Sequence, residues 1–424
     1  MKRSYDVVIA GGGPAGLSAA EVIASRGWSV CVAERMPSIA EKVRTSGGTL
    51  VHCMRELGVP ERLYHVIDAL RFQAPGGHVE FAMDDPRVCV IDVRGVFRLL
   101  ADRAAAAGAE VLTGTVADGP SVDYFSGYAT GCRLVRRGHA PATVRARVLI
   151  DATGYASVLA KASGLHPGFR RYAFGAELEL HAPNADQKNA TVFLDGRHAP
   201  AQYRWVFPRG GGRVRIGVGV LHADTRASPR DLLARLRRDV AGFGVDLAGA
   251  EVVEEHHGLI PSDGLPRRFT GDGILAVGDA AGQPTLVVGE GIRVAVEAGR
   301  LAGETVADAL SARDVSAARL GRYEREFRRR FERDLAIGHA VNRVLARWDD
   351  GDRDRFVRGV RDMPPAVVAK LLLSRFTDPQ VVGWVMTHPV MWRTFLRAAA
   401  RRLTPWARRP AELVAADASG AVPV

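Results

Sequence analysis

The glycine-rich turn at residues 11–16 is the feature that most constrains this chain. It reads Gly-Gly-Gly-Pro-Ala-Gly and follows the short apolar run of residues 5–10, which is typical of a buried parallel strand. Apolar residues at helical spacing continue to Gly27, and a second apolar run, residues 28–33, ends at Glu34. Strand, glycine turn, helix, strand and acidic residue in this order predict a dinucleotide-binding βαβ unit.

Each position of the turn has a separate physical task. Gly11 allows the tight turn, Gly13 allows the backbone to approach a pyrophosphate, and Gly16 lets the helix pack closely on the strand. Pro14 and Ala15 begin the helix, whose free N–H groups and partial positive charge attract phosphates. All five residues are therefore candidate cofactor-binding residues.

The acid at the end of the second strand completes the motif. Glu34 is expected to accept hydrogen bonds from an adenosine ribose, and the adjacent Arg35 is included as a candidate cofactor-binding residue. The alternative, an ordinary βαβ turn with no ligand, gives Glu34 no role.

Composition restricts the class of protein. With 424 residues, 47% hydrophobic and 25% charged, the chain is expected to form two or three globular domains. Lys2 and Arg3 precede an apolar run, but glycines interrupt this run too early for a cleavable signal peptide. The sequence contains no uncharged apolar stretch of about 18 residues, so no membrane-spanning helix is expected. The four cysteines lack metal-ligand spacing, which favours reduced thiols, no metal site and a cytoplasmic location.

The positive charge favours some partners over others. The formal net charge is +11, and arginines are dense over residues 322–409. No nucleic-acid-binding module is recognisable, so no nucleic-acid partner is expected. An anionic membrane surface or an acidic lipid is the better expectation, and the alternative is that arginine is simply the surface cation of this chain.

The order of predicted elements indicates an α/β fold whose domains are interleaved. Pro75-Gly76-Gly77 predicts the turn of a hairpin, strand patterns dominate residues 170–262 around a helix at 229–241, and the last part is helical, with a disordered tail after Pro410. The predicted units are a nucleotide-binding domain of residues 1–70, 91–165 and 263–310, a mixed or antiparallel β domain of residues 71–90 and 166–262, and a C-terminal helical region of residues 311–424.

Three separated segments coincide in a way that is specific. They are residues 11–16 with Glu34, the Asp-Ala-Thr-Gly at 151–154, and the Gly-Asp-Ala-Ala-Gly at 278–282 followed by Gly-Glu-Gly-Ile at 289–292. Together they resemble the FAD-dependent oxidoreductases of the aromatic-hydroxylase-like superfamily, which implies a Rossmann-like domain that binds FAD without a covalent link.

The resemblance also implies residue roles. Asp279 would bind the ribityl and pyrophosphate region, and the turn at 289–291 would bring a helix N-terminus towards the isoalloxazine ring. Arg94 matches an arginine that contacts the flavin, with a solvated arginine at a helix start as the alternative. Beyond the first turn, the implied cofactor-binding residues are Arg44, Arg94, Gly154, Gly278, Asp279, Gly289, Gly291 and Ile292.

A fourth segment, Tyr203-Arg-Trp205-Val-Phe207-Pro, resembles the Tyr-x-Trp-x-Phe-Pro motif of geranylgeranyl reductases. That family saturates isolated double bonds in polyprenyl chains of lipids, quinones or prenyl diphosphates. On a strand the three aromatic residues share one face and could line an apolar tunnel or stabilise a developing cation. The alternative is that they are core residues of a sheet.

One departure from the family concerns the proton donor. Where archaeal members carry a cysteine-glycine pair, this chain has Ser46-Gly47, and Cys53 is no obvious substitute. Serine is a poor acid unless a relay assists it. The resemblance therefore implies Ser46, Tyr203, Trp205 and Phe207 as the candidate catalytic residues, with the proton source open.

Other functions on the same fold stay open. An FAD-dependent monooxygenase or halogenase acting on an apolar or aromatic molecule is the main alternative, and Arg44 resembles an arginine of flavin hydroxylases. A flavoprotein without turnover that carries lipid is the third. No second glycine motif with strand–helix context indicates a nicotinamide domain, so NADPH or a ferredoxin is expected as external electron donor.

The last helical stretch suggests how a lipid substrate would reach the protein. Residues 381–403, interrupted by Pro389, combine Trp384 and Trp392 with aliphatic residues and a rim of arginines. This pattern is typical of an interfacial helix, which predicts peripheral contact with the inner face of a membrane. The alternative is an amphipathic helix packed on the nucleotide-binding domain.

Overall fold

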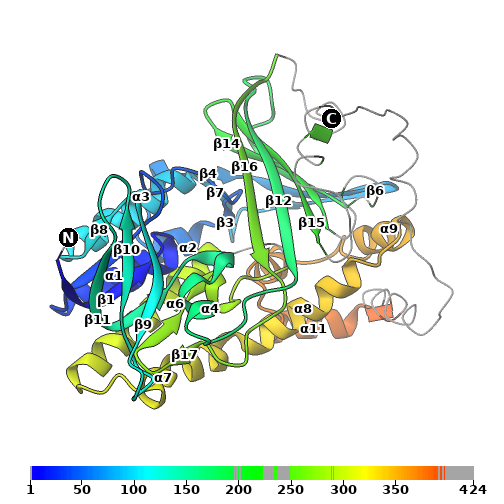
Figure 1. Ribbon diagram of the computed structural model, residues 1–424. Helices are drawn as coiled ribbons and strands as arrows, with labels where there is room; N and C mark the ends of the chain where they lie inside the picture. The colour runs from blue at the N-terminus through cyan, green and yellow to red at the C-terminus, as the bar shows by residue number, and fades with distance from the viewer. Residues whose placement is uncertain are drawn as a thin grey trace, which may run out of the picture.

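The computed structural model describes residues 2–194, 196, 199, 202–222, 231, 234, 235, 238, 249–287, 289, 291–389, 392, 393 and 396. Figure 1 shows a sheet near the N-terminus, a second sheet that rises from the centre, and C-terminal helices along the lower edge. The predicted α/β fold with a nucleotide-binding sheet, a second sheet and a helical C-terminal region is confirmed.

The first sheet is built around parallel strands. Its order is β17-β18-β11-β1-β2-β8, and an antiparallel pair, β9 and β10, extends from β11. The four residues of β2 are fully buried, and β1 is buried over its last four, as expected for strands covered on both faces. The strands are β1 (Ser4–Ala10), β2 (Val30–Ala33), β8 (Glu110–Leu112), β9 (Thr115–Val122), β10 (Ala129–Arg136), β11 (Ala142–Asp151), β17 (Thr270–Gly271) and β18 (Ile274–Ala276).

The second sheet has seven strands in the order β16-β12-β15-β14-β13-β5-β6. All neighbours are antiparallel except β13 and β5. The predicted hairpin is confirmed: β5 and β6 pair through Ala74 and Gly77. The strands are β5 (Ala69–Ala74), β6 (Gly77–Ala82), β12 (Tyr172–His181), β13 (Asn189–Phe193), β14 (Arg204–Gly210), β15 (Arg213–Leu221) and β16 (Glu251–Pro261).

A small third sheet lies between the two large ones. It has the order β3-β7-β4, and its strands are β3 (Gly48–Leu50), β4 (Tyr64–Ile67) and β7 (Val88–Ile91). Strand β3 leads directly into α2 (Val51–Glu56). The segment that contains Ser46 therefore joins β2 of the parallel sheet to β3 of this small sheet.

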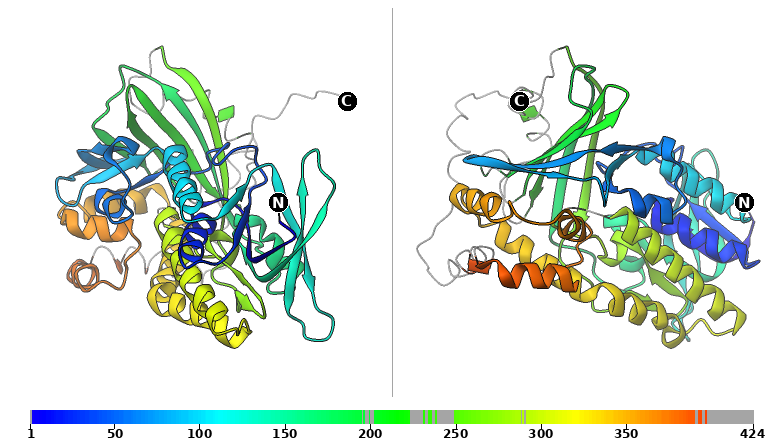
Figure 2. Two further views of the ribbon diagram at one scale, coloured as in Figure 1. Left: turned by 90° about the vertical axis from the view of Figure 1, so that its left-hand side faces the viewer. Right: turned by 180° about the vertical axis from the view of Figure 1, so that it is seen from behind.

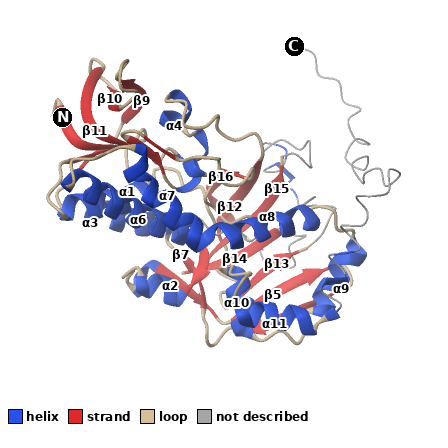
Figure 3. Ribbon diagram, turned by 90° about the horizontal axis from the view of Figure 1, so that it is seen from below, coloured by secondary structure: helices blue, strands red, loops and turns tan. Residues whose placement is uncertain are grey.

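Most of the helices lie on one face of the parallel sheet or below the second sheet, whereas α4 (Val158–Ala162) packs on the opposite face of the parallel sheet. Seen from below in Figure 3, α1, α6 and α7 lie side by side near the parallel sheet, and α8 leads towards α9, α10 and α11 below the second sheet. The same arrangement is seen from behind in Figure 2. These helices are α1 (Pro14–Ser25), α3 (Val93–Ala106), α4 (Val158–Ala162), α6 (Ile292–Ser311), α7 (Ala317–Phe327), α8 (Arg333–Leu345), α9 (Asp350–Gly359), α10 (Pro365–Leu372) and α11 (Pro379–Thr387).

Some expectations fall where the structure gives no description. The helix expected at 229–241 lies almost entirely outside the described residues, and so does the whole tail after Pro410. The expected break near Pro389 agrees with the end of α11 at Thr387. Among the helices of the described residues, none has both the length and the apolar character that crossing a bilayer requires.

Two glycines in α6 let this helix pack in close contact with the backbone of α1. A Cβ atom at Gly299 would lie 2.2 Å from the carbonyl oxygen of Ala15, and one at Gly303 would lie 2.9 Å from Cβ of Val22. Both glycines are in the interior of α6, where glycine costs helix stability, so close packing explains their presence. This contact places the start of α6 near the first glycine turn.

We predict that Gly299→Ala lowers the free energy of unfolding by about 1–3 kcal/mol, because the added methyl group collides with backbone of α1. Urea unfolding of purified protein measures the effect. Gly383→Ala is the matched control, since that glycine is also inside a helix, α11, and a Cβ there meets nothing within 4 Å. The control should stabilise slightly, and an equal response of both variants would contradict the packing argument.

Candidate functional site

The first glycine turn forms an open cradle at the start of α1. Gly11 has φ +107°, and a Cβ there would lie 2.2 Å from the carbonyl oxygen of Ala152, so no other residue fits. A Cβ at Gly13, in contrast, would meet no atom within 4 Å. Helix α1 begins at Pro14 without a side-chain cap. Free backbone N–H groups thus face open space, as binding of a pyrophosphate requires.

Glu34 lies beside this cradle at the end of β2. Its carboxylate accepts hydrogen bonds from the backbone N–H groups of Gly12 and Met36, both at 2.8 Å. These bonds orient the carboxylate, and each oxygen keeps further acceptor capacity for a ribose hydroxyl. Arg35 is exposed, and partial desolvation together with the charge of Arg35 lowers the pKa of Arg44. An anion near these two guanidinium groups would relieve their repulsion.

The turn that contains Asp279 meets the same cradle. Gly278 has φ +63°, and a Cβ there would lie 3.1 Å from Cβ of Ala15, at the start of α1. Burial raises the pKa of Asp279 to about 6. No described residue donates a hydrogen bond to this carboxylate, so a ligand that carries hydroxyl groups would complete it.

Asp151 shapes the third motif. It is buried and accepts hydrogen bonds from Thr153 N at 2.9 Å, Thr153 Oγ1 at 2.6 Å and Ala160 N at 2.7 Å. Burial raises its pKa, although these bonds oppose the shift. Gly154 has φ +69°, and a Cβ there would meet open space. The residues present at all three motifs therefore fit an elongated dinucleotide such as FAD.

The three aromatic side chains of the fourth motif form a row. The ring of Trp205 is 5.9 Å from that of Tyr203 and 6.2 Å from that of Phe207, measured between centroids. Burial raises the pKa of Tyr203. Phe207 lies against Gly48, whose Cβ would come within 3.3 Å of the ring. The row thus runs from the second sheet to the small third sheet.

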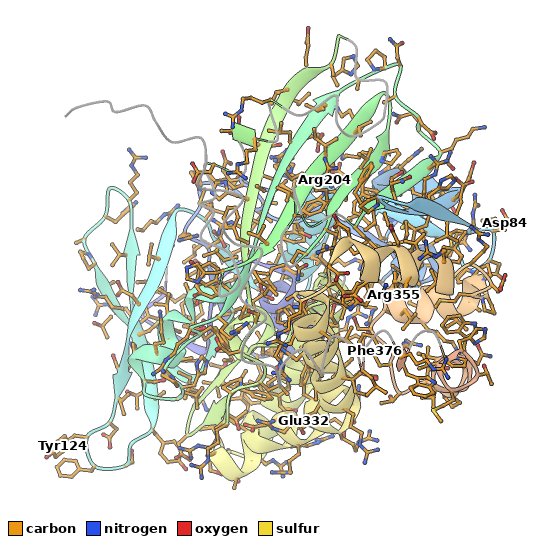
Figure 4. The ribbon with its side chains drawn as sticks, turned by 90° about the vertical axis from the view of Figure 1, so that its right-hand side faces the viewer. Asp84, Tyr124, Arg204, Glu332, Arg355 and Phe376 are labelled. Carbon is orange, nitrogen blue, oxygen red and sulfur yellow. The ribbon has the colours of Figure 1, made fainter. Side chains whose placement is uncertain are left out.

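A largely apolar cavity of about 180 Å³ lies next to this row. Leu50, Leu70 and Phe72 belong to one part of its wall, and Trp348 and Phe356 to another. Figure 4 shows the two layers: Arg204 marks the second sheet above, and Arg355 on α9 and Phe376 mark the helical layer below. An apolar chain is the kind of ligand that this cavity suits.

The cavity brings together several residues predicted from sequence. Ser46 and Tyr203 line it, and they also line a smaller adjoining cavity of about 80 Å³. A Cβ at Gly289 would lie 3.8 Å from the hydroxyl oxygen of Tyr203, so the turn before α6 touches the aromatic row. The predicted residues that line the larger cavity are Ser46, Tyr203, Phe207, Gly289, Gly291 and Ile292, whereas Trp205 lines only the smaller one.

Arg94 has protein partners in this structure. Its Nε donates to the carbonyl oxygen of Ala40 at 3.1 Å, and its terminal nitrogen forms an ion pair with Glu254 at 2.7 Å. The side chain thus fastens the segment before Ser46 to β16. A contact of Arg94 with the flavin stays a prediction.

Sequence reasoning missed the buried charges next to the aromatic row. Arg215 is 1% exposed and donates to the carbonyl oxygen of Ser46 at 2.7 Å and to Glu179 at 2.9 Å. Glu177 accepts a hydrogen bond from Nε1 of Trp205 at 2.8 Å, and His256 contacts Glu177. The sequence did contain a signal for them. In β12 and β15, charged residues occupy alternate positions and the positions between them are apolar, a pattern that can indicate charges on a buried face.

Comparison with known proteins shows the family to which this chain belongs. A family model described as FAD binding domain matches residues 4–336. Digeranylgeranylglycerophospholipid reductase 2 of Methanothermobacter thermautotrophicus is 32% identical over 380 residues, which cover 88% of this chain and 95% of that protein. A digeranylgeranylglycerophospholipid reductase of Methanosarcina mazei is 30% identical, over 86% of this chain and 90% of that protein.

Solved structures share the fold. A geranylgeranyl bacteriochlorophyll reductase-like protein from Thermoplasma acidophilum has a TM-score of 0.80 and 23% identity, over 91% of this chain and 99% of that chain. The flavin-dependent brominase Bmp2 has a TM-score of 0.68 and 18% identity, over 94% of this chain and 100% of that chain. At these identities the likeness concerns the fold alone.

We predict that Asp279→Asn weakens FAD binding by at least about tenfold, because the amide oxygen is a weaker acceptor than the carboxylate.

The FAD-free Asp279→Asn variant should be more stable than wild type at pH 7, since the raised pKa of about 6 makes the buried charge unfavourable. The folded protein binds the proton more tightly than the unfolded chain, so this advantage shrinks as the pH falls from 7 to 4.5. Flavin titration and urea unfolding measure both effects, and an advantage that does not change with pH would contradict the argument.

Proposed function

Because this chain belongs to the digeranylgeranylglycerophospholipid reductase family of FAD-dependent oxidoreductases, we propose that it saturates isolated double bonds of geranylgeranyl chains carried by a glycerophospholipid. The observation that carries the proposal is the apolar cavity whose wall includes Tyr203 and Phe207 of the aromatic row and the turn before α6. A lipid chain in this cavity would lie beside the cofactor-binding turns.

The residues of this chain would hold the cofactor and the lipid in fixed positions. The cradle at Gly13, the carboxylate of Glu34 and that of Asp279 would bind FAD, which supplies the hydride when it is bound and reduced. Tyr203 and Phe207 would orient the alkene, and the apolar wall would exclude water that could trap cationic character.

The electron donor is part of the proposal. The sequence contains one glycine motif in strand–helix context, at residues 11–16. A transiently docked NADPH or a ferredoxin would therefore reduce the bound FAD.

Peripheral contact with a membrane is also proposed, and exposed apolar side chains near the C-terminus support it. In α11, Val382 is 46% and Met386 is 72% exposed, whereas Trp384 is buried. Beyond it, Trp392 is exposed, and the guanidinium of Arg393 lies 5.9 Å from its ring centroid. Apolar side chains with adjacent cations suit an interface of anionic lipid.

The reductase activity is tested with chemically reduced, FAD-loaded protein and digeranylgeranylglycerophospholipid under anaerobic conditions. We expect flavin reoxidation coupled to a mass gain of two hydrogen atoms for each saturated bond. Phe207→Leu should lower kcat/KM at least about tenfold through loss of orientation, with FAD affinity within twofold of wild type. Phe81→Leu is the control, because Phe81 is buried in the same sheet but does not line the cavity. A product that forms only in the presence of oxygen or halide would contradict the proposed reductase activity and support the monooxygenase or halogenase alternative.

We predict that Val382→Glu combined with Met386→Glu lowers co-sedimentation with anionic vesicles several-fold, because charged side chains oppose insertion of α11. The control is Val252→Glu combined with Val253→Glu, which adds the same charge at exposed valines of β16. An equal loss in both variants would show that net charge alone governs binding.

A further inference from the structure

The proposed reaction needs a proton that the lipid cavity does not provide. Saturation of an isolated alkene adds a hydride to one carbon and a proton to its neighbour. Among the described residues that line the larger cavity there is no aspartate, glutamate, histidine or cysteine. Its ionisable groups are Tyr203, Arg293 and Arg353. Ser46 is a weak acid by itself, so the proton must come from a stronger acid that lies behind it.

The smaller cavity holds the groups that the larger one lacks. It shares Ser46 and Tyr203 with the larger cavity, and its wall includes Glu177 and His256. These two side chains are 3% and 2% exposed, respectively. A carboxylate and an imidazole this deeply buried lose favourable hydration, so they need partners inside the protein. A buried pair of this kind at the wall of a cavity is a candidate functional site.

The strand register aligns a continuous path from solvent to this cavity. Glu177 of β12 is directly opposite His256 of β16, and Nδ1 of His256 is 2.8 Å from Oε1 of Glu177. Glu254 is two residues before His256 on the same face of β16, and its Oε2 is 3.3 Å from Nε2 of His256. The Glu254 side chain is 30% exposed, so the path begins at solvent.

Trp205 closes the inner end of this path. Its indole N–H donates to Oε2 of Glu177 at 2.8 Å, so one oxygen is held by Trp205 and the other faces His256. The indole crosses β15 at Gly217, where a Cβ would lie only 2.1 Å from the ring. The tryptophan of the aromatic motif and this glycine thus position Glu177 next to the smaller cavity.

We propose that Glu254, His256 and Glu177 form a proton relay that feeds the alkene through the boundary between the two cavities, at Ser46 and Tyr203. This inference rests on the proposed function. For each double bond, one proton enters at Glu254 and passes the imidazole and Glu177. It then forms one new C–H bond, while the hydride from the reduced cofactor forms the other. Solvent returns one proton to Glu254, so the relay is unchanged after each cycle.

Charged groups from the neighbouring elements surround the relay. Although partial burial opposes the shift, the hydrogen bond from Arg94 and the proximity of His256 lower the pKa of Glu254. Nε of Arg215, on β15, is 3.8 Å from Oε1 of Glu177. Other charged or titratable groups close by are His257, Arg44, Lys42, Glu179, Arg209 and Arg213. Arg94 favours the ionised form of Glu254, so this carboxylate can accept a proton from solvent at the outer end of the path.

The test uses the FAD-loaded, chemically reduced enzyme with its lipid and the variants Glu177→Gln and His256→Gln. Each should lower the rate of lipid reduction at least about tenfold, with FAD affinity within twofold of wild type. Added formate or imidazole should restore several-fold activity by supplying protons. Glu255→Gln is the matched control: it removes a carboxylate of β16 that lies between Glu254 and His256 in sequence but on the opposite face of the strand, and we expect a wild-type rate, a wild-type pH profile and no rescue.

A second measurement does not depend on turnover. In the 15N-histidine NMR spectrum, the signal lost in His256→Gln identifies the His256 ring, and its titration midpoint should move in Glu177→Gln and in Glu254→Gln. An unmoved midpoint, or a Glu177→Gln enzyme with wild-type rate and pH profile, overturns the relay. If wild type itself reduces no prenyl lipid, the reductase proposal fails, and the NMR titration alone decides whether the three groups share a proton.

Discussion

The contact between the start of α1 and two glycine-containing elements is the constraint on which the rest of the structure depends. Ala15 lies against the turn at Gly278 on one side and against Gly299 of α6 on the other. A Cβ at Gly299 would lie 2.2 Å from the carbonyl oxygen of Ala15, so a larger residue there would push the two helices apart. At Gly278 a Cβ would lie 3.1 Å from Cβ of Ala15, and the φ of +63° also favours glycine. The glycine cradle, the carboxylate of Asp279 and the N-terminus of α6 come together because backbone packs directly on backbone here.

The second sheet is fastened to this centre by buried charge rather than by apolar packing alone. Arg215 reaches from β15 to the carbonyl oxygens of Ser46 and Ile91, at 2.7 and 3.3 Å. Its Nε is neutralised by Glu179, and these charge-assisted bonds replace the water that burial removes from the guanidinium. The loop that carries Ser46 is therefore fixed by the same strand that supports Trp205.

The sequence was sufficient for the features that depend on local geometry. Glycine spacing at residues 11–16 and 278–282 predicted the two turns, and alternation predicted that Tyr203, Trp205 and Phe207 share a face. It was insufficient for contacts between distant segments. The ion pair of Arg94 with Glu254 and the role of Gly217 depend on strand register, which local patterns do not specify. The cavity wall formed by Trp348 and Phe356 depends equally on how α8 and α9 return below the second sheet.

In the proposed reaction, the two cavities would serve the opposite demands of the two hydrogens that an alkene receives. A hydride is protected by dry, apolar surroundings, whereas a proton must come from a group that exchanges with solvent. A single cavity lined by both kinds of residue would admit water to the lipid. Ser46 and Tyr203 lie at the boundary of both spaces, so a proton can cross there while Glu177 and His256 stay behind the aromatic row. With the proposed relay as the proton source, serine at position 46 is compatible with catalysis, because the acid lies one step further back, at Glu177 and His256.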